Sequence, residues 1–120
     1  MKYGIIELSV VPGRAEASDK SEMTTQLLFG DLFSIIEESD KFIHIKIQYD
    51  NYECWICKKQ YLPISKTEFI EISNSPYHCV TDLVQVISYK KNFVPIVQGS
   101  SLPYYKNGEF TLDNNKVLFK

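Results

Sequence analysis

The sequence predicts an all-β protein built on a small barrel, and three features of the chain indicate this. Apolar and polar residues alternate over short segments, most regularly over residues 41–49 (KFIHIKIQY), as in strands with one buried face. Turn signals lie between such segments, at residues 12–13, 30–31 and 50–51. No segment has the spacing of a convincing helix. Short strands separated by tight turns are typical of a barrel that closes on itself.

Four segments are expected to form this barrel, in chain order. Residues 5–11 form a strand that ends at a Pro-Gly turn, and residues 25–39 form either two short strands or one strand kinked at Gly30. Residues 41–49 and 52–62 form a hairpin around an Asp-Asn turn, and a proline closes the second of these strands.

The strand over residues 41–49 has two chemically different faces. One face carries Phe42, His44, Lys46 and Gln48, and the other carries Ile43, Ile45, Ile47 and Tyr49. The isoleucine face is expected to be the core face, because it is the uniformly apolar one. His44 then points toward solvent or a neighbouring loop rather than into the core.

The second half of the chain is expected to be a linker followed by more β structure. Residues 66–79 contain a loop signal at Ser-Asn-Ser-Pro, and their first half could be a short helix or a strand. Residues 80–120 return to β character, but forty residues are marginal for an independent core. This part therefore either packs on the first barrel or is the start of an incomplete unit, and the strand-like ending VLFK favours the incomplete unit.

Composition excludes several classes of function. The chain has 120 residues, 44% of them hydrophobic, and a net charge of −2. Nucleic-acid binding is not expected, because there is no clustered basic footprint. No membrane span is expected, because no apolar run approaches about 18 residues. The N-terminus is too short and too polar for a secretion signal, so we expect a cytoplasmic protein, although a periplasmic location would also fit.

The cysteines favour neither a metal site nor a redox pair. Cys54 and Cys57 have the spacing of such sites, but they lie in a predicted strand, where they point to opposite faces. Only His44, His78 and Cys79 remain as further zinc ligands. We expect two separate thiols, no metal and no cofactor. A redox or metal protein remains as the alternative.

No catalytic residue is predicted, so whether the chain belongs to an enzyme is uncertain. The candidate bases are His44 and His78, and Cys79 follows His78 too directly for the two side chains to face each other. A binding surface is then the remaining kind of site. Glu22 in the long polar loop over residues 13–24 could meet a cationic ligand or be a solvated charge, and Tyr52 could offer its hydroxyl or only pack.

Two segments of the chain resemble a known family. Residues 8–31 (LSVVPGRAEASDKSEMTTQLLFGD) and 49–56 (YDNYECWI) are similar to the first bacterial SH3 (SH3b) domain of NlpC-type cell-wall cysteine peptidases. The most similar subgroup is the γ-D-glutamyl-L-diamino acid endopeptidases, or dipeptidyl-peptidase VI. The shared pattern comprises Arg14, Glu16, Ser21-Glu22-Met23, Gln26 to Asp31, and Tyr52 to Trp55. Residues 94–105 resemble, more weakly, the opening of the second SH3b domain of these enzymes.

The resemblance implies a fold, a partner and a ligand. The fold would be an SH3-like (SH3b) barrel over residues 1–65, a linker over 66–79 and part of a second SH3b-like unit over 80–120. In the family, an acid and a tyrosine at the positions of Glu22 and Tyr52 bind the free N-terminal L-Ala of a muropeptide that the enzyme cleaves in cell-wall recycling. A stand-alone module that binds wall peptides or a protein partner is the alternative.

Two departures from the family pattern limit the functional roles that the resemblance implies for this chain. Cys54 occupies a position where the family usually has glycine, which could alter the local packing. The C-terminal NlpC-type catalytic domain of the family has no counterpart in these residues. None of the three cysteines therefore inherits the role of nucleophile.

Overall fold

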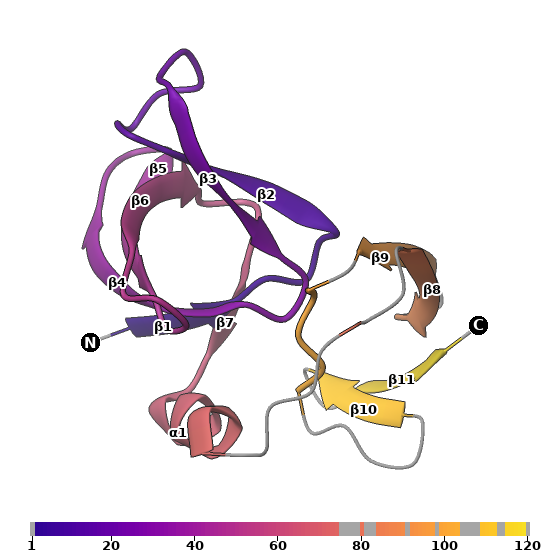
Figure 1. Cartoon of the computed structure of the whole chain (residues 1–120). Coiled ribbons are helices and arrows are strands. Elements are labelled where there is room, and N and C mark those ends of the chain that lie inside the picture. The colour runs from indigo at the N-terminus through magenta and orange to yellow at the C-terminus, as the bar shows by residue number, and fades with distance from the viewer. Residues whose placement is uncertain are drawn as a thin grey trace.

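The computed structural model describes residues 2–74, 80, 84–90, 92–97, 99–103, 109–112 and 115–119. Its strands form two antiparallel sheets, with one helix between them in the chain (Figure 1). The predicted all-β class is therefore confirmed.

The first sheet curls into a ring, which Figure 1 shows in indigo to magenta. Its strands are β1 (Lys2–Ile5), β2 (Val10–Arg14), β3 (Met23–Leu28), β4 (Leu32–Glu38), β5 (Phe42–Ile47), β6 (Glu53–Cys57) and β7 (Leu62–Ile64), in the spatial order β3-β2-β6-β5-β4-β1-β7. Residues 25–39 thus form two strands rather than one kinked strand. They are separated at Gly30, whose φ of +86° is a conformation that suits glycine.

The interior of the ring is filled by aliphatic side chains, one phenylalanine and one cysteine. They are Ile6, Val11, Leu27, Phe33, Ile35, Ile43, Ile45, Ile47, Cys54 and Ile56. The predicted isoleucine face of β5 is confirmed by this cluster. The prediction for Tyr49 is wrong: β5 ends at Ile47, so Tyr49 lies in the following turn with 82% of its surface exposed. Phe42, on the opposite face, is buried.

The undecided segment after the barrel begins with a helix, α1 (Lys66–Asn74). Ser65 and Glu68 form a capping box, in which the Glu68 N–H donates to Ser65 Oγ (3.1 Å) and the Ser65 N–H donates to Glu68 Oε1 (3.3 Å). Phe69 packs on Tyr3 of β1, with ring centroids 4.3 Å apart, which holds the helix against the barrel. The proline of the predicted loop and the rest of residues 75–79 lie outside the described residues.

The second sheet consists of β8 (Val84–Tyr89), β9 (Asn92–Val97), β10 (Glu109–Leu112) and β11 (Asn115–Phe119), in the order β10-β11-β8-β9. It shares a hydrophobic core with one side of the barrel. Ile5, Phe29, Leu32, Val80, Ile87, Tyr89, Ile96 and Leu102 form this shared core. Val80, Ile87, Tyr89, Ile96 and Leu102 therefore pack on the barrel, against apolar side chains that include Phe29 and Leu32 beside the β3–β4 turn.

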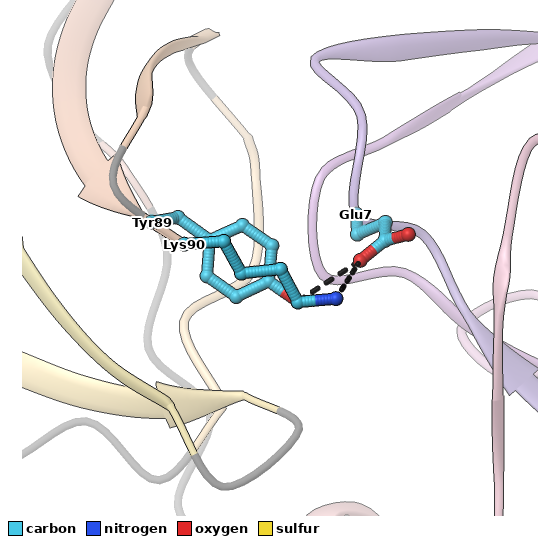
Figure 2. Close-up of polar contacts among 3 residues, drawn as sticks. All are labelled: Glu7, Tyr89 and Lys90. Atoms are coloured by element: carbon cyan, nitrogen blue, oxygen red, sulfur yellow. Dashed lines mark hydrogen bonds and ion pairs between the residues drawn. The ribbon is translucent and has the colours of Figure 1, made fainter.

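A polar contact joins the two parts beside the shared core (Figure 2). The Tyr89 hydroxyl donates to Glu7 Oε2 at 2.9 Å, and Lys90 Nζ lies 3.4 Å from the same oxygen. Burial, followed by the hydrogen bond to Glu7, raises the pKa of Tyr89. Nearby, the Ser9 hydroxyl donates to the carbonyl of Pro95. These bonds pair the hydroxyls of Tyr89 and Ser9 at the edge of the junction.

The β3–β4 turn makes a close backbone contact with the second part. The Ser101 N–H donates to the Phe29 carbonyl at 2.8 Å, and a Cβ on Gly30 would collide with the Ser101 carbonyl. Asp31 accepts the Leu28 N–H at 2.8 Å in this turn. Burial raises the pKa of Asp31 to about 6, and the negative charge of Asp50 adds to the rise.

The raised pKa of Asp31 predicts how stability depends on pH. The folded protein binds this proton at a higher pH than the unfolded chain, whose carboxyl has a pKa of 3.8, so stability should fall as the pH rises from about 4 to about 6. Asp31→Asn should remove this part of the pH dependence and stabilise the protein at pH 7.5 by about 1–2 kcal/mol, after allowance for partial solvent screening. Urea denaturation of both proteins between pH 4 and 8 measures the difference. If the stability of the two proteins changed with pH in the same way, the raised pKa of Asp31 would be contradicted.

The packing of Cys54 against Gly13 gives a second prediction. A Cβ on Gly13 would lie 2.7 Å from Cys54 Sγ and 2.7 Å from Thr25 Cγ2. Gly13→Ala should therefore cost about 1–3 kcal/mol of stability through overpacking. Because Cys54→Gly removes one of the two obstacles, the double variant should lose less stability than the sum of the two single variants. Strict additivity in thermal denaturation would show that the two residues are not coupled.

Candidate functional site

The long polar loop between β2 and β3 is ordered by its own hydrogen bonds. The Ala15 N–H donates to the Glu22 carbonyl (2.9 Å), and the Glu16 N–H donates to Ser21 Oγ (2.9 Å). Two further bonds turn the chain at the tip, from the Ser18 N–H to the Glu16 carbonyl and from the Ser21 N–H to the Ser18 carbonyl. The loop projects beyond the ring in Figure 1 as a continuation of the β2–β3 hairpin. Its length therefore builds a defined protrusion.

Arg14, the last residue of β2, holds the base of this loop. Its Nη1 donates to the Ser21 carbonyl at 3.0 Å, across the hairpin. The side chain is partly buried. Together with the Ala15–Glu22 bond, this contact fixes the backbone on both sides of Glu22, while the Glu22 side chain is exposed.

Tyr52 follows the turn between β5 and β6, which confirms the predicted hairpin. The Ile47 N–H donates to the Tyr52 carbonyl (2.9 Å), and the Tyr52 N–H donates to Asp50 Oδ1 (3.0 Å). Asn51 has a φ of +60°, a left-handed conformation that asparagine tolerates well. The turn leaves 40% of Tyr52 exposed.

Glu22 and Tyr52 lie at the same end of the sheet. Strands β3 and β6 both pair antiparallel with β2, so they run parallel to one another. Glu22 directly precedes β3 and Tyr52 directly precedes β6. Two strand spacings, roughly 10 Å, separate β3 from β6. Among the described residues, no hydrogen bond or ion pair joins the two side chains. Both residues are exposed.

A row of paired residues crosses the sheet beside Glu22 and Tyr52. In it Met23 pairs with Arg14, Arg14 with Trp55, Trp55 with His44, and His44 with Glu37. Residues that pair directly across antiparallel strands point to the same face, and here that is the outer face. The sequence alone could not find this row, because the pairing of β2 with β6 joins residues some forty positions apart.

His44 and Trp55 stack on one another in this row. Their ring centroids are 4.9 Å apart and their planes differ by 14°. His44 Nε2 also lies 3.6 Å from Glu53 Oε1. The expectation that His44 points away from the core is correct, and the partner that it finds there is an aromatic ring. The stack gives the outer face of β5 and β6 a partly apolar patch next to Arg14.

The cysteines of β6 are separate thiols, as predicted. Both are free; Cys54 is buried and Cys57 is partly exposed. Burial, followed by the charge of Asp50, raises the pKa of the Cys54 thiol to about 11, which disfavours the nucleophilic thiolate. Among the described residues, no three His, Cys, Asp or Glu side chains gather as metal ligands, and none of their helices has the length and apolar character to cross a bilayer. His78 and Cys79 lie outside the described residues.

Part of the chain matches a family model, and the fold is similar to that of a solved structure. Residues 13–60 match the family model described as the bacterial dipeptidyl-peptidase SH3 domain, and this segment contains Arg14, Glu22, Tyr52 and Trp55. The fold is also similar to the crystal structure of an NlpC/P60 family protein from Bacillus cereus. The TM-score is 0.76 at 15% sequence identity, over 98% of this chain and 54% of that one. None of the curated proteins matches this chain.

These findings confirm the expected SH3b-like fold. The chain spans about half the length of the NlpC/P60 family protein, and at this low identity the likeness concerns the fold. The segment that matches the family model runs from the end of β2 to just beyond β6, so it contains the loop, the β5–β6 turn and the outer row.

The different burial of the two thiols predicts different reactivity. In a Cys79→Ser background, a thiol reagent at pH 8 should modify Cys57 first, because Cys54 is only 2% exposed and its pKa of about 11 leaves little thiolate. Cys57→Ala should remove the fast phase and Cys54→Ala should leave it intact. Equal rates for the two thiols would contradict the burial of Cys54, and unfolding in urea should make them equal.

Proposed function

We propose that this chain is the non-catalytic SH3b region of a bacterial endopeptidase that cleaves peptidoglycan fragments between γ-D-Glu and a diamino acid. In this proposal it helps to form the pocket for the free N-terminal L-Ala of the muropeptide. The main support is the position of Glu22 and Tyr52 at the same end of two parallel strands, within the segment that matches the dipeptidyl-peptidase SH3 domain.

The chemistry of these two residues suits a free amino group. The exposed Glu22 carboxylate can accept hydrogen bonds from an ammonium group, and the Tyr52 hydroxyl can accept another. An acylated amine has no charge and fewer N–H donors, so it would leave the carboxylate without a partner in a closed pocket. The ordered loop lowers the entropic cost of binding, because its backbone is already held in place.

The nucleophile would come from an NlpC-type catalytic domain outside these 120 residues. Neither described cysteine suits that role. Cys54 is buried with a raised pKa, and Cys57, three residues later in the same strand, pairs with Phe42 rather than with a histidine. Such an enzyme would act in the cytoplasm, on muropeptides recovered from the wall.

Replacement of Glu22 tests this proposal. An NMR titration of the ¹⁵N-labelled chain with L-Ala-γ-D-Glu-diamino acid should shift the amides of the β2–β3 loop and of Tyr52. The N-acetylated peptide should bind about tenfold more weakly, as expected for a lost charge-assisted hydrogen bond. Glu22→Gln should lower the affinity for the free amine to about that of the acetylated peptide.

Glu16→Gln provides the matched control, because Glu16 is an exposed acid in the same loop whose backbone, not its carboxylate, makes the described bond. This variant should bind both peptides like the wild type. Equal losses in the two variants would indicate a general charge effect, and unchanged binding by Glu22→Gln would refute the assigned role.

A further inference from the structure

A carboxyl group lies at the contact between the barrel and the second part of the chain. Asp31 directly follows Gly30 in the β3–β4 turn, and a Cβ on Gly30 would collide with the backbone of Ser101. The Ser101 N–H also donates to the Phe29 carbonyl at 2.8 Å. The turn that bears Asp31 is therefore in direct contact with the second part.

Ser101 binds this turn through its side chain as well as through its backbone. Its hydroxyl donates to the Asp31 carboxylate, which also accepts the Leu28 N–H at 2.8 Å. Phe29 and Leu32, on either side of the turn, belong to the core that the barrel and the second part share. Asp31 is thus half-buried where the two parts meet, and separating them would expose its carboxyl to water.

The charge that acts on Asp31 disfavours its ionised form. This charge is that of Asp50, in the turn between β5 and β6. From the second part, residues 99–103 add no charged side chain. None of the ion pairs in the described part of the chain includes Asp31. The ionised carboxylate is therefore partly buried beside a like charge and without a cationic partner.

The other charged groups at the junction bind one another. The connection between β1 and β2 reaches the turn where the Ile6 N–H donates to the Asp31 carbonyl at 3.0 Å. The next residue, Glu7, is bound by the Tyr89 hydroxyl and by Lys90, as Figure 2 shows. These groups hold another edge of the same junction.

The position of Asp31 links the contact to pH. Burial, followed by the charge of Asp50, raises the pKa of Asp31 from 3.8 to about 6. Below about pH 4 the carboxyl is protonated whether or not the two parts are in contact. Between about pH 4 and about pH 6 the exposed carboxyl loses its proton first, so separation becomes easier as the pH rises. Above about pH 6 the weakening is complete.

We propose that the β3–β4 turn and residues 99–102 form a pH-sensitive joint, which holds the second part most tightly when Asp31 is protonated and loosens when Asp31 is ionised. The barrel can stay folded while the joint opens, because its interior cluster is separate from the shared core. The inference does not depend on the proposed function or on its ligand.

Hydrogen exchange in the full chain tests the joint at single amides. The Ser101 amide bonds across the joint, and the Ile47 amide bonds to the Tyr52 carbonyl within the barrel. Between about pH 4.5 and about pH 7.5, the protection factor of Ser101 should fall about tenfold more than that of Ile47. The limit is about a hundredfold, the ratio that the change in the pKa of Asp31 allows, and the barrel itself causes part of that change.

Three variants assign the response to Asp31. Asp31→Asn keeps an acceptor for the Leu28 N–H but cannot ionise, so the extra loss of protection at Ser101 should disappear. Asp50→Asn should make this loss smaller, because it removes the charge that adds to the rise in the pKa of Asp31. Asp40→Asn is the matched control: Asp40 is an exposed acid beyond the opposite end of β4, and this variant should respond like the wild type.

Several results would overturn the joint. Equal changes at Ser101 and Ile47 would show that pH acts on global stability alone, and constant protection at Ser101 would show that ionisation does not loosen the contact. A response that persists in Asp31→Asn would belong to another group. A ¹³C NMR titration of the Asp31 carboxyl needs no substitution: a pKa near 6 supports the joint, and an ordinary value would refute it.

Discussion

The pairing of Arg14 in β2 with Trp55 in β6 is the contact on which the rest of the site depends. It joins the β2–β3 hairpin to the other strands of the barrel and sets the register between them. The packing beneath it is tight, because the Cys54 side chain occupies the space where any side chain on Gly13 would lie. Gly13 on the neighbouring strand thus leaves room for the Cys54 side chain, whose buried thiol contributes to the packing.

Several properties of the site follow from that pairing. It sets β3 and β6 parallel on the two sides of β2, so the residues before both strands, Glu22 and Tyr52, lie at one end of the sheet. It also aligns Arg14 with the His44–Trp55 stack on the outer face. The loop bonds around Arg14 and Ser21 then hold the backbone of the protrusion in place.

The second sheet packs on the barrel beside the β3–β4 turn, not beside the candidate site. The shared core, the bond between Tyr89 and Glu7 and the contact of Gly30 with Ser101 attach it to the barrel on the side of the β3–β4 turn. Burial of this turn raises the pKa of Asp31, so the ionised carboxylate lowers the stability of the folded protein at neutral pH. The attachment uses β3 at its C-terminal end, whereas the loop with Glu22 lies at its N-terminal end. The C-terminal end of β3 therefore contacts the second sheet, and its N-terminal end carries the loop with Glu22.

The sequence by itself determined the local structure and the types of residue at the site. Alternation predicted the isoleucine face of β5, the Asp-Asn turn and the outward direction of His44, because these depend on neighbours in the chain. It failed for Tyr49, since a strand can end earlier than its apolar pattern does. It also failed for two expected strands: residues 5–11 are divided between β1 and β2, with the Pro-Gly pair inside β2, and residues 52–62 are divided between β6 and β7, with the proline inside β7. Only the tertiary structure decided which strand lies beside β2, and with it the row from Met23 to Glu37, the Gly13–Cys54 contact and the neighbours of Arg14. These contacts join residues far apart in sequence, and the alternation within a strand carries no information about its partner.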